Sequence, residues 1–132
     1  RLQQKYDLAL APIVFEVEAV ALQTVNLPTH RDISKFQAVT RDLALVVKQT
    51  VAAQDLIDVF HAEINKGESC KNVQDLVLIE EYRGKGLEND EKSLAFRFSL
   101  QDTQNTLQDE TVELAMAALV AAATAGVSAR LR

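Results

Sequence analysis

Four stretches of the chain show the pattern of β-strands. Residues 41–47 and 92–101 carry an apolar side chain at every second position, as strands with one buried face do. Residues 73–82 form a third extended stretch, and residues 127–132 alternate as a short last strand. We therefore expect four strands that each turn one face toward a core.

Two further stretches show helical spacing. Leu56, Phe60 and Ile64 predict a helix that ends near Gly67. A second, longer helix is expected to end at Gly126, and acidic residues in its first turn favour its start. Its apolar stripe and its acidic residues are Val112, Ala115, Met116, Leu119, Val120, Ala123, Asp109, Glu110 and Glu113.

The order of these elements is βαββαβ, which predicts an α+β, ferredoxin-like sandwich of an antiparallel sheet with two helices on one face. We assign it to residues 34–132. Residues 1–33 are interpreted as a short extended segment, the tail of a preceding domain and a linker. Within them Ile13–Glu18 alternates as a strand, and a proline lies between Val25 and Thr29. The chain is accordingly interpreted as a fragment of a larger protein.

Composition narrows the function. The chain is 48% hydrophobic, enough for one core, and no apolar run reaches the ~18 residues that a membrane span needs. A single cysteine, Cys70, excludes an internal disulfide and agrees with a reducing, cytoplasmic location. His30 and His61 have no partner at metal-ligand spacing, so we expect no metal site.

The net charge of −5 argues against an independent nucleic-acid binder unless the basic residues gather on one face. The strand alternation predicts such a face, because the helices cover only one side of the sheet. It would carry one aromatic residue beside three arginines, an arrangement suited to stacking on bases. The expected members are Asp42, Ala44, Glu80, Tyr82, Ser93, Ala95, Arg97, Ser128, Arg130 and Arg132.

Catalytic patterns are missing from the sequence. The run from Arg83 to Gly86 lacks the spacing of a phosphate-binding loop, and we interpret it as a flexible hairpin whose glycines allow positive φ. Glu80 and Glu81 are adjacent on a strand, so they point to opposite faces and cannot act as a pair on one substrate. No nucleophile has a base beside it.

Five motifs together resemble a known family. They are Ile33-Ser34-Lys35-Phe36, Arg41-Asp42-Leu43-Ala44, Tyr82-Arg83-Gly84, Lys92-Ser93-Leu94-Ala95-Phe96-Arg97 and Thr106-Leu107-Gln108-Asp109-Glu110. In order and spacing they are similar to the C-terminal ferredoxin-fold anticodon-binding domain of the bacterial phenylalanine–tRNA ligase beta chain. The resemblance also implies that residues 1–33 are the tail of the catalytic-like module that precedes this domain in the family. One departure is Gln37, where the family usually has proline, and it touches no expected RNA contact.

The resemblance implies recognition of the anticodon stem-loop of tRNA(Phe), with aminoacylation on the alpha chain of the same class II ligase. No catalytic residue and no cofactor would belong to this fragment, and ATP and Mg would bind elsewhere in the parent enzyme. Tyr82 would stack on the first anticodon base, and Glu80 and Ser93 would bond to base edges. Further expected contacts with base or phosphate are Arg130, Arg97 and Lys92.

A second hypothesis remains open. A ferredoxin-like domain can also be a regulatory module that binds a small molecule or dimerises through its sheet. Arginines on the open side of the sheet argue against that hypothesis. Neither hypothesis includes a membrane or DNA as partner.

Overall fold

The structure is a computed structural model that describes residues 2–23 and 34–132. The chain divides into two units, Arg1–Asp32 and Ile33–Arg132, and each is described by itself. The proline-bearing connector expected after Val25 and the polar stretch that follows it lie outside the described residues.

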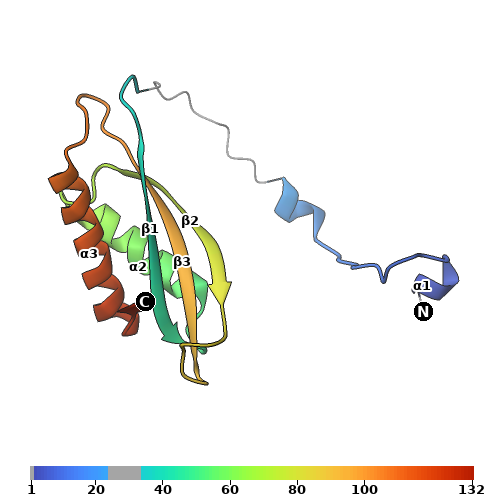
Figure 1. Ribbon diagram of the computed structural model, residues 1–132. Coiled ribbons are helices and arrows are strands. Elements are labelled where there is room, and N and C mark those ends of the chain that lie inside the picture. The colour runs from blue at the N-terminus through green and yellow to red at the C-terminus, as the bar shows by residue number, and fades with distance from the viewer. Residues whose placement is uncertain (1, 24–33) are drawn as a thin grey trace. The chain divides into compact units, whose positions relative to one another are not determined.

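The second unit is built on one antiparallel sheet (Figure 1). Its strands lie in the order β2-β3-β1-β4. The edge strands are therefore β2 and β4, and β1 and β3 pair at the centre. This is the order of a ferredoxin-like sheet, and the predicted fold class is confirmed. The strands are β1 (Val39–Lys48), β2 (Val73–Tyr82), β3 (Glu91–Leu100) and β4 (Arg130–Leu131).

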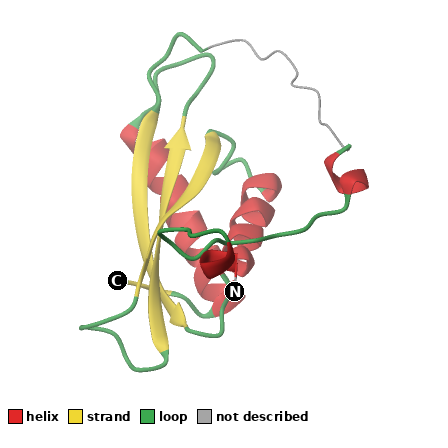
Figure 2. Cartoon of the chain, turned by 90° about the vertical axis from the view of Figure 1, so that its right-hand side faces the viewer, coloured by secondary structure: helices red, strands yellow, loops and turns green. Residues whose placement is uncertain are grey.

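Two helices, α2 (Ala53–Lys66) and α3 (Asp109–Val127), lie on one side of the sheet, as Figure 2 shows. Phe60 of α2 packs edge-on against two rings of β3, with centroids 5.2 Å from Phe96 and 5.1 Å from Phe98. All three rings are fully buried. Burying such side chains contributes about 1.5–3 kcal/mol each, so this cluster fixes which sheet face is covered.

Both helix starts agree with the sequence. At α2 the Asp55 carboxylate accepts a hydrogen bond of 2.8 Å from the Ala52 backbone N–H, which satisfies one free donor of the first turn. Asp109 and Glu110 stand in the first turn of α3. The alternation of apolar residues in β3 also holds, because Leu94 and Leu100 are both fully buried on the helix side.

The end of α3 differs from the prediction. Gly126 lies inside the helix, and the residue that stops it is Ser128, which adopts the left-handed conformation at φ 55°. The Ala129 backbone N–H donates a hydrogen bond of 3.3 Å to the Ala123 carbonyl. The helix therefore extends past Gly126, to Val127. The last strand is therefore shorter than predicted, covering Arg130–Leu131 instead of residues 127–132.

In the first unit the structure shows a short helix, α1 (Leu2–Lys5), and a 3₁₀ turn, η1 (Ala19–Leu22). The strand predicted at Ile13–Glu18 is wrong, because within residues 2–23 and 34–132 no strand pairs with this segment to form ladder hydrogen bonds. Their apolar side chains are exposed, with Ile13 at 95% and Phe15 at 82%.

Among the described residues, α3 is the one helix long and apolar enough to cross a membrane by length and composition. The sequence pattern had suggested no such run. In this fold the helix packs on the sheet instead, and Val112, Ala115, Leu119 and Ala123 are buried in the core. Packing thus explains this buried stripe, whereas Leu114 of the same helix is exposed.

Candidate nucleic-acid interface

The sheet face opposite the helices is formed by every second residue of the strands, and we call it the open face. Its members follow from the register, because residues paired across strands point to the same side. They are Thr40, Asp42, Ala44, Val46, Lys48, Asp75, Val77, Glu80, Tyr82, Glu91, Ser93, Ala95, Arg97, Ser99, Arg130 and Arg132. Ser128, expected here, belongs to the cap of α3 instead.

One row of this face crosses all four strands. Tyr82 of β2 pairs with Ser93 of β3, Ser93 with Val46 of β1, and Val46 with Arg130 of β4. Although Val46 and Ser93 stand on the face without helices, they are only 1% and 2% exposed. Neighbouring side chains of the open face must therefore cover them.

Tyr82, the first member of this row, contacts a side chain from the opposite edge of the sheet. The guanidinium carbon of Arg132 lies 4.5 Å from the centroid of the Tyr82 ring, a cation–π contact. Arg132 follows β4 and its backbone N–H bonds to the Ala44 carbonyl at 3.1 Å, whereas Tyr82 ends β2 on the opposite edge. The two side chains consequently meet above the central strands.

Small residues make this crossing possible. Ala44 and Ala95 are register partners in the next row of the open face, at the centre of the sheet. Because the side chains of Ala44 and Ala95 are single methyl groups, the Arg132 side chain can extend above them toward β2. Glu80 lies on the edge strand β2, pairs with Ala95 in the same row and is exposed.

The Tyr82 ring is also held by the hairpin after β2. Its hydroxyl donates a long hydrogen bond of 3.4 Å to the Lys85 carbonyl. A Cβ at Gly84 would lie 2.7 Å from the Tyr82 hydroxyl oxygen, so only glycine lets the backbone approach the ring this closely. The predicted positive φ occurs at Gly86, at 92°.

Two arginines of the open face are engaged by carboxylates. Arg97 donates two hydrogen bonds of 2.7 Å to the oxygens of Asp42, a bidentate pair, and this contact holds the pKa of the Asp42 carboxyl below its ordinary value. Arg130 donates one of 2.7 Å to Glu91, whose pKa is likewise lowered by that bond. The Glu91 side chain is only 11% exposed.

The open face is therefore balanced in charge. Its basic residues are Lys48, Arg97, Arg130 and Arg132, and its carboxylates are Asp42, Asp75, Glu80 and Glu91. The strongly basic platform that the net charge seemed to demand is not present. The charged residues missed by the sequence reasoning are Lys48, Asp75 and Glu91. The position of Glu91, two residues before Ser93, already placed it on this face.

Five of the six sequence-predicted RNA contacts share this face, and Lys92 does not. Lys92 has the parity of the buried Leu94, so it points to the helix side, where its side chain is 7% exposed. Its Nζ lies 3.6 Å from a carboxylate oxygen of Glu81. This position excludes Lys92 from a contact surface formed by the open face. The residues brought together are Tyr82, Glu80, Ser93, Arg130 and Arg97.

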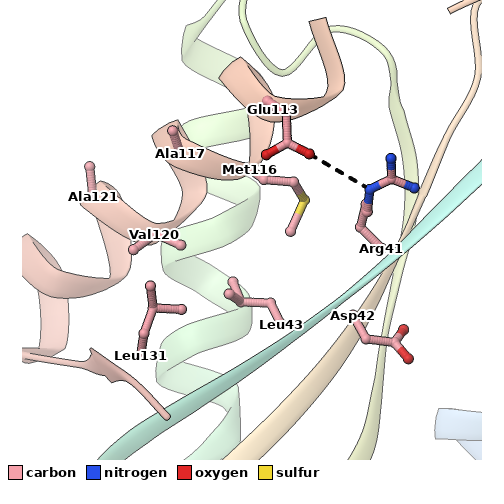
Figure 3. A pocket seen from close by; sticks show the side chains of 9 residues that line it. All are labelled: Arg41, Asp42, Leu43, Glu113, Met116, Ala117, Val120, Ala121 and Leu131. Carbon is pink, nitrogen blue, oxygen red and sulfur yellow. Dashed lines mark ion pairs between the residues drawn. The ribbon is translucent and has the colours of Figure 1, made fainter. Parts of the chain in front are cut away.

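A groove of about 540 Å³ lies between α3 and the strands β1 and β4 (Figure 3). Leu43, Met116 and Leu131 contribute apolar side chains to it, and Arg41 reaches toward Glu113, with 4.0 Å between Nε and Oε1. The volume is that of small-molecule sites. The charged side chains in its lining are already paired with one another or, for Asp42 at the rim, with Arg97, so none is left to orient a ligand.

Residues 2–23 and 34–132 contain neither a candidate metal site nor an accessible thiol. No group of three or more His, Cys, Asp or Glu side chains there could hold a metal ion. Cys70 is buried, and desolvation raises the pKa of its thiol, which keeps it protonated and unreactive.

Comparison with known proteins gives a family for this geometry. The ferredoxin-fold anticodon binding domain matches residues 34–132. Among similar proteins is the phenylalanine–tRNA ligase beta subunit of Cupriavidus pinatubonensis, 49% identical over 98% of this chain. The beta subunits of Burkholderia lata and Dechloromonas aromatica are 48% and 46% identical over 100% and 98% of the chain. The chain spans only 16% or 17% of the length of these relatives.

Proposed function

The chain belongs to the family of ferredoxin-fold anticodon binding domains, and from this premise we propose that its open face recognises the anticodon stem-loop of tRNA(Phe). The names of its relatives, all phenylalanine–tRNA ligase beta subunits, support the choice of tRNA. The observation that carries the proposal is the Tyr82 ring, held at the edge of the one sheet face that no helix covers.

Stacking is the interaction that this ring offers. Every base has a π-face, and a base stacked on an aromatic side chain is worth about 1–3 kcal/mol. Glu80 stands one row away and is exposed, so its carboxylate can accept from the exocyclic amino or imino N–H groups of guanine. Ser93 lies beside Tyr82 and would meet the same or the next base.

The arginines serve phosphates and base edges in this proposal. Arg97 and Arg130 present planar guanidinium groups whose positions are already fixed by Asp42 and Glu91. Guanidinium forks bind phosphate oxygens as they bind carboxylates. An RNA phosphate would therefore join or replace a carboxylate at these two points.

The test is the binding of the 132-residue chain to a phenylalanine anticodon stem-loop and to the same stem with a scrambled loop. Tyr82→Ala is expected to weaken binding of the first RNA about five- to hundredfold, because a stacking platform is lost. Binding of the scrambled loop is expected to change much less. Fluorescence anisotropy of labelled RNA at low and moderate salt gives both affinities.

Tyr6→Ala is the matched control, because Tyr6 is the only other tyrosine of the chain and lies in the first unit, 60% exposed. This variant is expected to bind like the unchanged chain. Equal affinity for the two loops, or no binding of either at low salt, would contradict anticodon recognition.

For the whole protein, we propose the role that the relatives' names indicate. The chain would be part of a beta subunit that positions tRNA while an alpha chain carries out aminoacylation. ATP and Mg would bind elsewhere in that cytoplasmic enzyme, and neither would be a cofactor of this domain. The regulatory alternative ranks second, because the groove beside α3 has the volume for a small ligand but its charged groups are already paired.

A further inference from the structure

We infer that Arg132 caps the base that stacks on Tyr82, so that the base lies between the tyrosine ring and the arginine guanidinium. This inference rests on the proposed function and adds a recognition residue to it. None of the five motifs includes Arg132, and its role follows from its position above the ring, 4.5 Å from the centroid.

The first argument concerns access to the ring. Arg132 lies over the Tyr82 ring, and Gly84 lies close to the hydroxyl end of the same side chain. Ser93, the register neighbour that would bond to a base edge, is only 2% exposed. A base can reach both residues only if the guanidinium moves off the ring.

The second argument concerns how easily it moves. Arg97 and Arg130 are held by carboxylates, whereas within the described residues Arg132 has the Tyr82 ring as its one charged or aromatic side-chain partner. An exposed cation–π contact is worth only about 0.5–1 kcal/mol. The backbone stays in place meanwhile, because the Arg132 N–H is bonded to the Ala44 carbonyl.

The third argument concerns where the guanidinium goes. A base that enters occupies about 3.4 Å, the spacing of stacked bases, so Arg132 needs to rise by about that distance. Its backbone lies beside Ala44, and its side chain already reaches the Tyr82 ring of β2. A guanidinium plane stacks on a base as it does on a tyrosine ring, so the contact with the ring is exchanged for one with the outer face of the base.

The experiment compares Arg132→Ala and Arg132→Lys with the unchanged chain, using the phenylalanine anticodon stem-loop at low salt and at about 0.3 M salt, where the Debye length is short. Arg132→Ala is expected to weaken binding about five- to twentyfold. Arg132→Lys keeps the charge but loses the plane, so at the higher salt it is expected to bind like Arg132→Ala.

Arg41→Ala is the matched control. It removes an arginine that pairs with Asp109 and Glu113 of α3 on the helix side, so it is expected to leave RNA binding unchanged. A second readout uses Tyr6→Phe, which leaves Tyr82 as the only tyrosine in a chain without tryptophan. In that background, RNA is expected to change the Tyr82 fluorescence less strongly when Arg132 is also replaced by alanine.

Each result has one reading. Tighter binding by Arg132→Ala would show that the guanidinium only blocks the ring, and full recovery by Arg132→Lys at both salt concentrations would reduce its role to charge. Either result overturns the capping inference and leaves anticodon recognition standing. If the unchanged chain binds neither the cognate nor the scrambled loop, the proposed function and the inference fall together.

Discussion

At the scale of single residues, several side chains of the open face are held in place by their neighbours in the free chain. Asp42 fixes Arg97, Glu91 fixes Arg130, and Tyr82 is fastened to the hairpin that follows it. Strand alternation alone placed Tyr82, Glu80 and Ser93 on one face. It could not reveal that Arg132 lies over the Tyr82 ring, because that contact joins opposite edges of the sheet.

For Lys92, the matching motif and the strand alternation predict different faces of the sheet. A lysine next to Ser93 in a matching motif is a plausible phosphate contact by sequence, but neighbouring strand residues point to opposite faces. Its alternation with Leu94 and Phe96 carried the information that it faces the helices. The general rule of period two was thus a better guide to this position than the motif.

A residue-scale prediction concerns the two glycines of the hairpin. In Gly84→Ala the new Cβ would lie 2.7 Å from the Tyr82 hydroxyl oxygen and 3.0 Å from Cζ, so the ring must turn away. RNA affinity is expected to fall about as far as in Tyr82→Ala, with little change in the thermal midpoint. Anisotropy titration and thermal unfolding measure the two effects.

Gly86→Ala is the matched comparison, because its Cβ meets no atom within 4 Å but its φ of 92° strains any other residue. It is expected to destabilise the fold by about 1 kcal/mol and leave RNA affinity unchanged. Wild-type affinity in Gly84→Ala would mean that the position of the Tyr82 ring does not matter.

At the scale of elements, patterns with many repeats were predicted well, and so was the end of α2 near Gly67, whereas the end of α3 was not. The ten-residue β1 and β3 and the stripe of α3 each contain several periods, so the sequence places them within a residue or two. The end of α3 depends on one residue. Glycine usually stops a helix, yet here Ser128 adopts the left-handed conformation and Gly126 has a different use.

That use is close packing of the two helices. A Cβ on Gly126 would lie 2.8 Å from Cγ2 of Val59 on α2, a β-branched side chain with little freedom to move. Gly126→Ala is therefore expected to lower the free energy of unfolding by about 1–3 kcal/mol, despite the better helix propensity of alanine. Urea unfolding followed by circular dichroism measures the change.

Two companion variants separate packing from helix termination. Gly126→Ala combined with Val59→Ala is expected to lose less stability than the sum of the single changes, because the clash disappears. Ser128→Gly is expected to stabilise the fold slightly, since glycine adopts the φ of 55° without strain. A stabilising Gly126→Ala would refute the packing explanation and restore Gly126 as a helix terminator.

At the scale of the whole molecule, acidic groups outnumber basic ones, and many of them are paired. The carboxyl pKa values of Asp42 and Glu91 are lowered by hydrogen bonds from Arg97 and Arg130, and that of Asp90 by Lys48. A lowered pKa in the folded state means that the folded chain binds fewer protons than the unfolded chain, so acid favours unfolding.

The resulting prediction is a loss of stability in acid. The contribution of these pairs is complete above the ordinary values of 3.8 for Asp and 4.5 for Glu, and it is lost as the pH falls through the lowered folded-state values. The urea midpoint is expected to be level between pH 7 and pH 5.5 and lower at pH 3.

Glu91→Gln tests the source of this loss. It removes the charge that Arg130 meets, so its midpoint is expected to lie below that of the unchanged chain at pH 7. At pH 3 the two midpoints are expected to converge, because protonated Glu91 resembles glutamine. A constant difference at both pH values would assign the effect to packing.

The balanced charge of the open face also bears on kinetics. A surface with a basic surplus draws a polyanion from a distance and accelerates encounter, but pairs such as Arg97–Asp42 have almost no field beyond their own length. This domain would not gather RNA from solution. An RNA that arrives by other means would stay only where its phosphates match the fixed arginines. Selectivity would then reside in how long a complex lasts, with the rate of encounter nearly the same for every RNA.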